Sequence, residues 1–254
     1  SSKKEFGMKQ GGLIIAILVL LFTCLCAPLT AQTRSVNYET YIVDNFDNPD
    51  DAEWTWIAAG SKFVTTGYPV LKYFDGMPNA IRVMQSNPEG QYKFLGLEFK
   101  FDRKGDNWVD IVPTKKGEGD KVVPFEIPFK GRIDRLDLWV WGANYDYSLE
   151  ILLRDCNGRV HTLPIGMVNF EGWKNMSVTV PSNIPQASPY LNGVQHMSMV
   201  AFRLRTMPTE RVDNFHIFFD QFKALTDTYM DSYDGFELVE AKFKDESENK
   251  EQGQ

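Results

Sequence analysis

The chain has 254 residues and a formal net charge of −7 at neutral pH, with 43% hydrophobic and 13% aromatic residues. An acidic chain without a cluster of Lys and Arg argues against binding to nucleic acid or to an anionic membrane, because neutralised phosphates supply most of the affinity in such complexes. Once the first segment is set aside, the remaining length favours one large domain rather than two.

The first segment, residues 1–31, has the pattern of a cleaved signal peptide. Lysines between residues 3 and 9 precede an almost unbroken apolar run at 13–25, and small residues then lead to a predicted cleavage site after Ala31. The run is shorter than the roughly 20 apolar residues of a stable membrane span. The leader has a net charge of +2, so its removal leaves a mature chain of net charge −9.

The cysteines leave two alternatives to simple cleavage open. Cys24 and Cys26 lie in the leader, so lipidation there competes with cleavage, as does retention of the segment as an uncleaved anchor. Met8 is an alternative natural start. The mature chain keeps only Cys156, which excludes an intramolecular disulfide and a Cys-based metal site. Its stability must therefore come from a hydrophobic core.

The mature chain consists of short apolar runs separated by Gly, Pro, Asn and Asp. Such runs of β-branched and aromatic residues predict strands, and their regular spacing predicts an all-β, jelly-roll-like antiparallel β-sandwich at 32–225. A charged tail at 226–254 is predicted to hold a short helix and then to be disordered. The predicted strands are 36–46, 80–84, 92–101, 108–112, 133–141, 147–155, 159–166, 173–180, 196–205 and 215–222. Asn157-Gly158 predicts a type I′ turn between two of them.

Alternation along the predicted strands separates a core face from a mixed face. Leu136, Leu138 and Val140 point one way, whereas Trp139 and Trp141 point the other. The mixed face combines Trp, Arg, Asp and Glu, a composition expected of an interface. The alternative is that a neighbouring loop covers the two tryptophans. The predicted contact residues are Trp139, Trp141, Arg203 and Arg205.

Catalytic patterns are not found in the sequence. The histidines are His161, His196 and His216, and none belongs to a zinc-protease pattern; His216 lies in an apolar strand and is predicted to be partly buried. A nucleophile elbow, a P-loop and a dinucleotide fingerprint are also lacking. A pair of catalytic carboxylates cannot be recognised from sequence alone. We therefore expect a protein that is not an enzyme and has no catalytic cofactor.

Two aspartates are candidates for a structural Ca²⁺ site. Asp47 lies near the start of the fold, and Asp220 lies in the last predicted strand. Both positions are typical of those at which jelly-roll binding modules bring oxygen ligands to Ca²⁺, a hard cation. The alternative interpretation is that both are surface aspartates at strand ends.

Four long strings of the mature chain, at 95–113, 131–166, 169–186 and 208–228, carry a family resemblance. They resemble the spirochaete flagellar filament outer layer (FlaA) family of periplasmic flagellar sheath subunits. The resemblance implies a structural subunit that coats a flagellin-type core in the periplasm and alters the stiffness and helical shape of the filament. It implies core subunits and neighbouring sheath subunits as partners, and it supplies no catalytic residues.

A second hypothesis remains open, because 136–181 is also similar in pattern to carbohydrate-binding jelly rolls. Trp139 and Trp141 would then stack on sugar rings of a soluble periplasmic carbohydrate-binding module. Glycans on the filament core would make the two hypotheses overlap. Fold analogy alone does not establish sugar binding.

Overall fold

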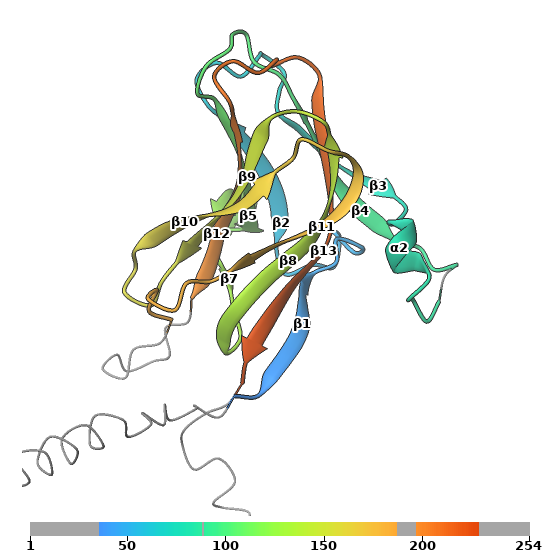
Figure 1. Cartoon of the computed structure of the whole chain (residues 1–254), viewed down its shortest axis with the longest axis vertical. Coiled ribbons are helices and arrows are strands. Elements are labelled where there is room, and N and C mark those ends of the chain that lie inside the picture. The colour runs from blue at the N-terminus through green and yellow to red at the C-terminus, as the bar shows by residue number, and fades with distance from the viewer. Residues whose placement is uncertain (1–35, 88, 187–196, 229–254) are drawn as a thin grey trace, which may run out of the picture. The chain divides into compact units, whose positions relative to one another are not determined.

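The computed structural model describes residues 36–87, 89–186 and 197–228, and within these ranges the chain is almost entirely β-structure (Figure 1). Two sheets, here called sheet A and sheet B, pack against each other, and every pairing between the described strands is antiparallel. The predicted all-β sandwich is confirmed. The predicted leader, His196 and residues 229–254 of the predicted tail lie outside the described residues.

Sheet A is built on the long last strand, which pairs with three strands from other parts of the chain. The strands in order across the sheet are β11 (Glu171–Thr179), β8 (Arg132–Ala143), β13 (Phe215–Asp227), β4 (Lys93–Phe99) and β3 (Val70–Asp75). A sixth strand, β1 (Tyr38–Asp44), pairs with the second half of β13. Therefore β4 and β1 follow one another along the same side of β13, and a gap between them faces residues 220–221.

Sheet B covers the other side of the core. Its strands in order are β10 (Val160–Met167), β9 (Tyr147–Arg154), β12 (Ser198–Thr206), β5 (Trp108–Lys116) and β2 (Thr55–Gly60), with β6 (Val122–Pro124) paired to β5 and β7 (Ile127–Pro128) paired to β12. A short helix, α2 (Asn79–Arg82), and a 3₁₀ turn (Glu118–Asp120) lie in connections.

The core forms where the inward faces of the two sheets meet. In β8, Leu136, Leu138 and Val140 are buried, and in β9, Tyr147 and Leu149 are buried, as the alternation predicts. Each fully buried large apolar side chain contributes roughly 1.5–3 kcal/mol. The inward side is thus filled by apolar groups, and any binding function must use the outward faces, the edges or the loops.

One predicted strand is wrong, and two strands were not predicted. The predicted strand at 80–84 is instead helix α2 and the residues after it; Val83 and Met84 are 82% and 72% exposed, so no second layer is available to bury a strand face there. The sequence reasoning also missed β2 and β3, which contain few β-branched residues and lie next to glycines.

The β9–β10 turn also differs from its prediction. Gly158 has a positive φ of 85°, but Asn157 is not in the left-handed region that a type I′ turn requires. Instead, the Gly158 N–H donates to the Asp155 carbonyl, and the Asp155 carboxylate accepts from the N–H groups of Asn157 and Arg159. The side chain of Asp155 therefore selects the turn geometry.

The last strand extends beyond the predicted domain end. Sequence patterning placed that end at residue 225, but β13 continues in register with β1 and β8 as far as Asp227. Within the described ranges, none of the helices is long and apolar enough to span a bilayer.

Candidate functional site

A cluster of aromatic rings covers the outward side of sheet A. Each of its five main strands contributes one large ring from the outward side of the alternation. We call this cluster the aromatic face; its residues are Phe74, Phe94, Phe218, Trp141 and Trp173, together with His216.

Strand register brings the rings into one row across the sheet. Phe74 on β3 lies directly opposite Phe94 on β4, and Trp141 on β8 lies directly opposite both Phe218 on β13 and Trp173 on β11. Directly opposed residues of an antiparallel pair lie on the same side of the sheet with neighbouring Cβ atoms. The row therefore follows from pairing between segments far apart in the chain.

The rings pack mainly edge to face. Phe218 is central: its ring centroid lies 5.5 Å from that of Phe74, 5.3 Å from Phe94 and 5.5 Å from Trp141, all at steep interplanar angles. Phe94 also meets Trp173 at 5.5 Å and 81°. Such pairs contribute about 0.5–1.5 kcal/mol beyond burial, so the cluster holds a defined shape while its outer surface stays open to solvent.

Gly96 permits this packing because it has no side chain. It lies opposite Phe218 in the register, and a Cβ atom at this position would be 2.5 Å from the Phe74 ring and 2.8 Å from the Phe218 ring. The rings of Phe74 and Phe218 therefore lie over the backbone of β4. Any larger residue at this position would separate them.

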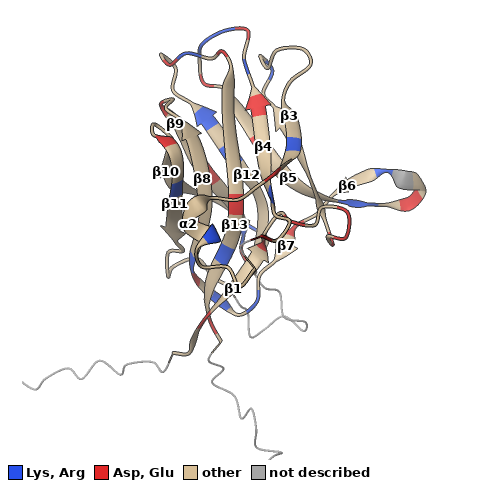
Figure 2. Ribbon diagram, turned by 90° about the vertical axis from the view of Figure 1, so that its right-hand side faces the viewer, with Lys and Arg blue, Asp and Glu red and all other residues tan. Residues whose placement is uncertain are grey.

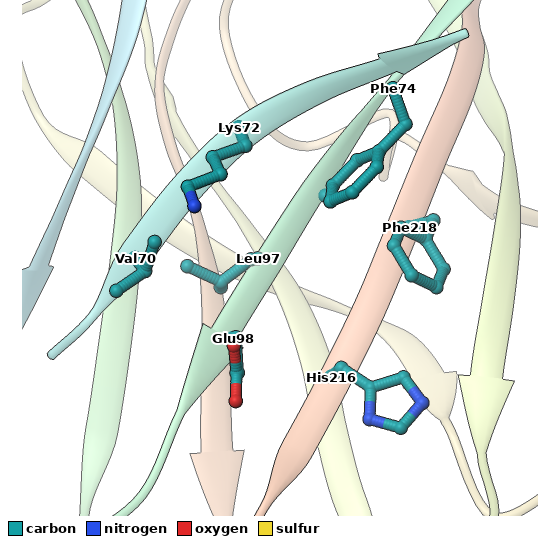
Figure 3. Close-up of a pocket in the computed structure, with 8 residues that line it drawn as sticks. Val70, Lys72, Phe74, Leu97, Glu98, His216 and Phe218 are labelled. Atoms are coloured by element: carbon teal, nitrogen blue, oxygen red, sulfur yellow. The ribbon is translucent and has the colours of Figure 1, made fainter.

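A hollow of about 350 Å³ opens beside the rings, between β3, β4 and β13 (Figure 3). Phe74 and Phe218 form one wall, and Lys72, Glu98 and His216 surround the rest. The hollow combines an apolar wall with a cation, an anion and an imidazole, a composition suited to a partner with both apolar and polar groups.

The structure separates the four predicted contact residues. Trp139 and Trp141 are half-buried on the outward side of β8 in sheet A, and Trp141 belongs to the aromatic face. Arg203 and Arg205 lie on β12 in sheet B, on the other side of the sandwich. The two pairs do not share one surface, because alternation identifies outward residues without identifying the sheet. In Figure 2, Lys and Arg are scattered rather than gathered in one patch.

The two arginines are engaged with carboxylates. Arg203 makes two hydrogen bonds of 2.7 Å to Asp110, its cross-strand partner on β5, and its guanidinium lies 4.8 Å from the Trp108 ring centroid. Arg205 lies 3.1 Å from Asp106 and 3.4 Å from Glu150. Both arginines thus already have acidic partners within sheet B.

The histidines differ from expectation in one respect. His216 is exposed rather than partly buried, and its ring stacks on Trp141 at 5.3 Å and 18°. The Nε2 atom of His161 lies 2.7 Å from Asp155 in the β9–β10 turn.

The two predicted cation ligands lie near the gap between β4 and β1, with a third acid. Asp44 ends β1, and its carboxylate accepts hydrogen bonds from the indole N–H groups of Trp54 and Trp56 and from the Phe46 N–H. Asp47 accepts from the Lys93 N–H at 2.9 Å and thereby fixes the loop after β1 to the start of β4. Asp220, on β13, is only 1% exposed.

Asp220 is the exceptional member of this group. Neither of its carboxylate oxygens accepts a well-formed hydrogen bond from the described residues. Burial, and then the negative charge of Asp47, raise the pKa of Asp220 to about 8, although the main-chain N–H of the next residue, Gln221, acts to lower it. Burial also raises the pKa of Asp44 and of Asp47. In the described part of the chain, no three His, Cys, Asp or Glu side chains are already arranged to hold a metal ion.

Sequence reasoning missed most of the aromatic face. Phe74 lies on β3, which was not predicted, and Phe94 and Trp173 lie on predicted strands but were not singled out. The available signal was the aromatic residue at an outward position of each strand. The order of the strands, which makes these rings neighbours, cannot be read from local periodicity.

Solved structures with a similar trace include carbohydrate-binding modules. TmCBM61 in complex with β-1,4-galactotriose has a TM-score of 0.37 and 14% identity, covering 72% of this chain and 98% of the module. A family 11 module from Clostridium thermocellum has a TM-score of 0.38 and 9% identity, covering 79% of this chain and all of the module. These TM-scores are too low to indicate a shared ligand.

Sequence relatives have a common description. A flagellar filament outer layer-like protein of Brachyspira hyodysenteriae is 26% identical over 208 residues, which cover 80% of this chain and 90% of the relative. A flagellar filament outer layer protein of Borreliella burgdorferi is 26% identical over 147 residues, covering 48% of this chain and 43% of the relative. The family model for the flagellar filament outer layer protein FlaA matches residues 35–234, so the chain belongs to that family.

Proposed function

We propose that this protein is a sheath subunit of the periplasmic flagellar filament, which coats a flagellin-type core through the aromatic face of sheet A. By adding a second layer it would stiffen the filament and change its helical shape. Family membership supports the sheath role. The observation that carries the choice of surface is the row of rings across all five main strands of sheet A.

The aromatic face has the properties of an interface core. Interfaces are enriched in Trp, Tyr and Phe at their centres, and those rings supply most of the binding energy. Phe74 is 43% exposed, so the row is accessible. Its rings are already fixed by mutual packing, and docking would therefore cost little side-chain entropy.

Sheet B would then face away from the core or towards neighbouring sheath subunits. Repeated head-to-tail contacts that do not close into a ring generate a helical layer, which a sheath on a helical core requires. Arg203 and Arg205 lie on sheet B and are candidates for such lateral contacts, together with the carboxylates that they already contact within this chain.

Co-sedimentation tests the proposed role. Filaments purified from periplasmic flagella and stripped of their outer layer should pellet together with added mature protein, and binding should saturate. The proposal fails if the protein stays in the supernatant while the stripped filaments pellet intact.

Carbohydrate binding is the second candidate function, and the hollow beside the aromatic face favours it. Aromatic walls with nearby polar groups suit sugar rings, and Lys72, Glu98 and His216 supply those groups. Affinity electrophoresis against a panel of glycans separates the two functions. Retardation by a glycan that is abolished in Phe218→Ala would favour sugar binding, whereas no retardation by any glycan would exclude it for that panel.

Export to the periplasm completes the proposal and is tested separately. The mature N-terminus is expected at Gln32 or within a few residues of it, because cleavage is predicted after Ala31. Mass spectrometry of the protein from purified flagella measures this directly. A mature protein that retains residues 13–25 would contradict release from the membrane.

A further inference from the structure

The Asp220 carboxylate is buried and poorly satisfied. The residue is 1% exposed, neither oxygen accepts a well-formed hydrogen bond from the described residues, and the main-chain N–H of Gln221 gives it only local support. An isolated buried carboxylate is strongly unfavourable unless a proton, a cation or hydrogen-bond donors neutralise it. Within the described ranges, Asp220 forms no ion pair with Lys or Arg. In the protein alone a proton on the carboxylate meets this cost at neutral pH, and a bound cation is the alternative that keeps the group charged.

The position of Asp220 explains why it is enclosed. It lies directly opposite Trp139 on β8, which places its side chain on the same outward side of sheet A as Trp139. The next residue, Gln221, has a positive φ of 50° at an irregularity in the β8–β13 pairing. At this point β13 passes from its pairing with β4 to its pairing with β1, and the loop after β1 is bonded to the start of β4 through Asp47 and the Lys93 N–H.

Asp47 brings a second carboxylate to this gap. It is held there by the Lys93 N–H, which donates to one oxygen at 2.9 Å, and by the Asn45 side-chain amide, which donates to the other at 2.7 Å. Each of these oxygens retains a further lone pair. Asp44 is nearby, but its carboxylate is occupied by the two indole N–H groups and a backbone N–H.

These observations together favour a bound cation. Two carboxylates with free lone pairs, one of them fully enclosed, attract a hard cation that prefers oxygen ligands, and Ca²⁺ tolerates irregular shells completed by main-chain carbonyls and water. We propose that Asp220 and Asp47 bind a Ca²⁺ ion in the gap between β4 and β1, together with main-chain oxygens of loop 45–48. The cation would link the loop after β1 to β13, so it would stabilise the fold whatever the aromatic face binds.

Thermal unfolding of the mature chain in Ca²⁺ and in EDTA tests the proposal. Wild-type protein should melt several degrees higher in Ca²⁺, because a ligand that binds only the folded state stabilises it. Calorimetric titration with CaCl₂ should show a single class of site. Equal melting temperatures in Ca²⁺ and EDTA would overturn the proposal, and an equal rise with Mg²⁺ would overturn the choice of Ca²⁺.

Variants locate the site. Asp220→Asn keeps the shape of the side chain and removes its charge, so it should abolish the Ca²⁺-dependent shift yet melt in EDTA no lower than wild type. That second result shows that the variant folds. Asp47→Asn should weaken the shift, and Asp75→Asn, at an exposed position that ends β3, should leave it unchanged. A full shift retained in Asp220→Asn would contradict the assignment.

Discussion

The indole ring of Trp141 on β8 stacks on the imidazole of His216 on β13, with ring centroids 5.3 Å apart and ring planes at 18°. These residues are 75 positions apart in the chain, and pairing between β8 and β13 makes them neighbours. His216 lines the hollow beside β3 and β4, and its stacking partner Trp141 lies in the row of larger rings, so the pair connects the two features. We therefore expect the binding energy of the aromatic face to concentrate around Trp141.

Replacing Trp141 with Ala should weaken attachment to stripped filaments. Central aromatic residues of interfaces contribute about 2 kcal/mol or more, which corresponds to about thirtyfold in affinity. Co-sedimentation at a series of protein concentrations measures the loss. Trp108→Ala is the matched control, because it removes the same side chain from the outward side of sheet B. If both variants bind as wild type does, the aromatic face is not the docking surface.

Replacing Gly96 with Ala should separate the rings of Phe74 and Phe218. The added Cβ would lie within 3 Å of both rings, and overpacking of this kind costs about 1–3 kcal/mol. We expect a lower melting temperature and weaker co-sedimentation. Ala59→Ser adds one atom at an exposed position of β2 and serves as the control. An unchanged melting temperature would mean that the rings move aside at no cost.

Arg203→Ala should chiefly lower the stability of the fold and affect filament binding less. The substitution removes two short hydrogen bonds to Asp110, whose side chain is only 14% exposed, and should lower the free energy of unfolding by about 1–2 kcal/mol. Urea denaturation measures this value. If stability is unchanged but filament binding falls, Arg203 is a direct contact residue, as the sequence predicted.

Asp155 should make the β9–β10 turn sensitive to acid. Burial alone would raise the pKa of Asp155, but hydrogen bonds from His161 and from the N–H groups of Arg159 and Asn157 outweigh it and hold the pKa below its usual value. A depressed pKa in the folded state stabilises the fold above the unfolded-state pKa, and that contribution is lost as pH falls through the folded-state pKa.

Urea denaturation of wild type and Asp155→Asn at several pH values checks this expectation. The variant should be less stable than wild type at neutral pH, and the difference should shrink below about pH 4. A difference that stays constant down to pH 2 would show that the carboxylate charge does not contribute. Asp75→Asn at the exposed end of β3 provides the comparison.

Local patterning in the sequence was sufficient for most strands and for the core. Alternation in 133–141 correctly assigned Leu136, Leu138 and Val140 to the interior, because a strand with one buried face repeats every second residue. Long strings of residues also identified the family. The same reasoning was wrong at 80–84, where an apolar run has no sheet to join and forms a helical turn beside exposed Val83 and Met84.

Tertiary structure alone decided where the candidate sites lie. Period-two patterning showed that Trp141 and Arg203 point outward, but only strand order showed that they face opposite sides of the sandwich. Asp220 was a candidate for a surface residue at a strand end, yet it is only 1% exposed where β13 changes from pairing with β4 to pairing with β1. The reason is physical: side-chain alternation depends on neighbouring residues, whereas burial and ring contacts depend on pairing between segments far apart in the chain.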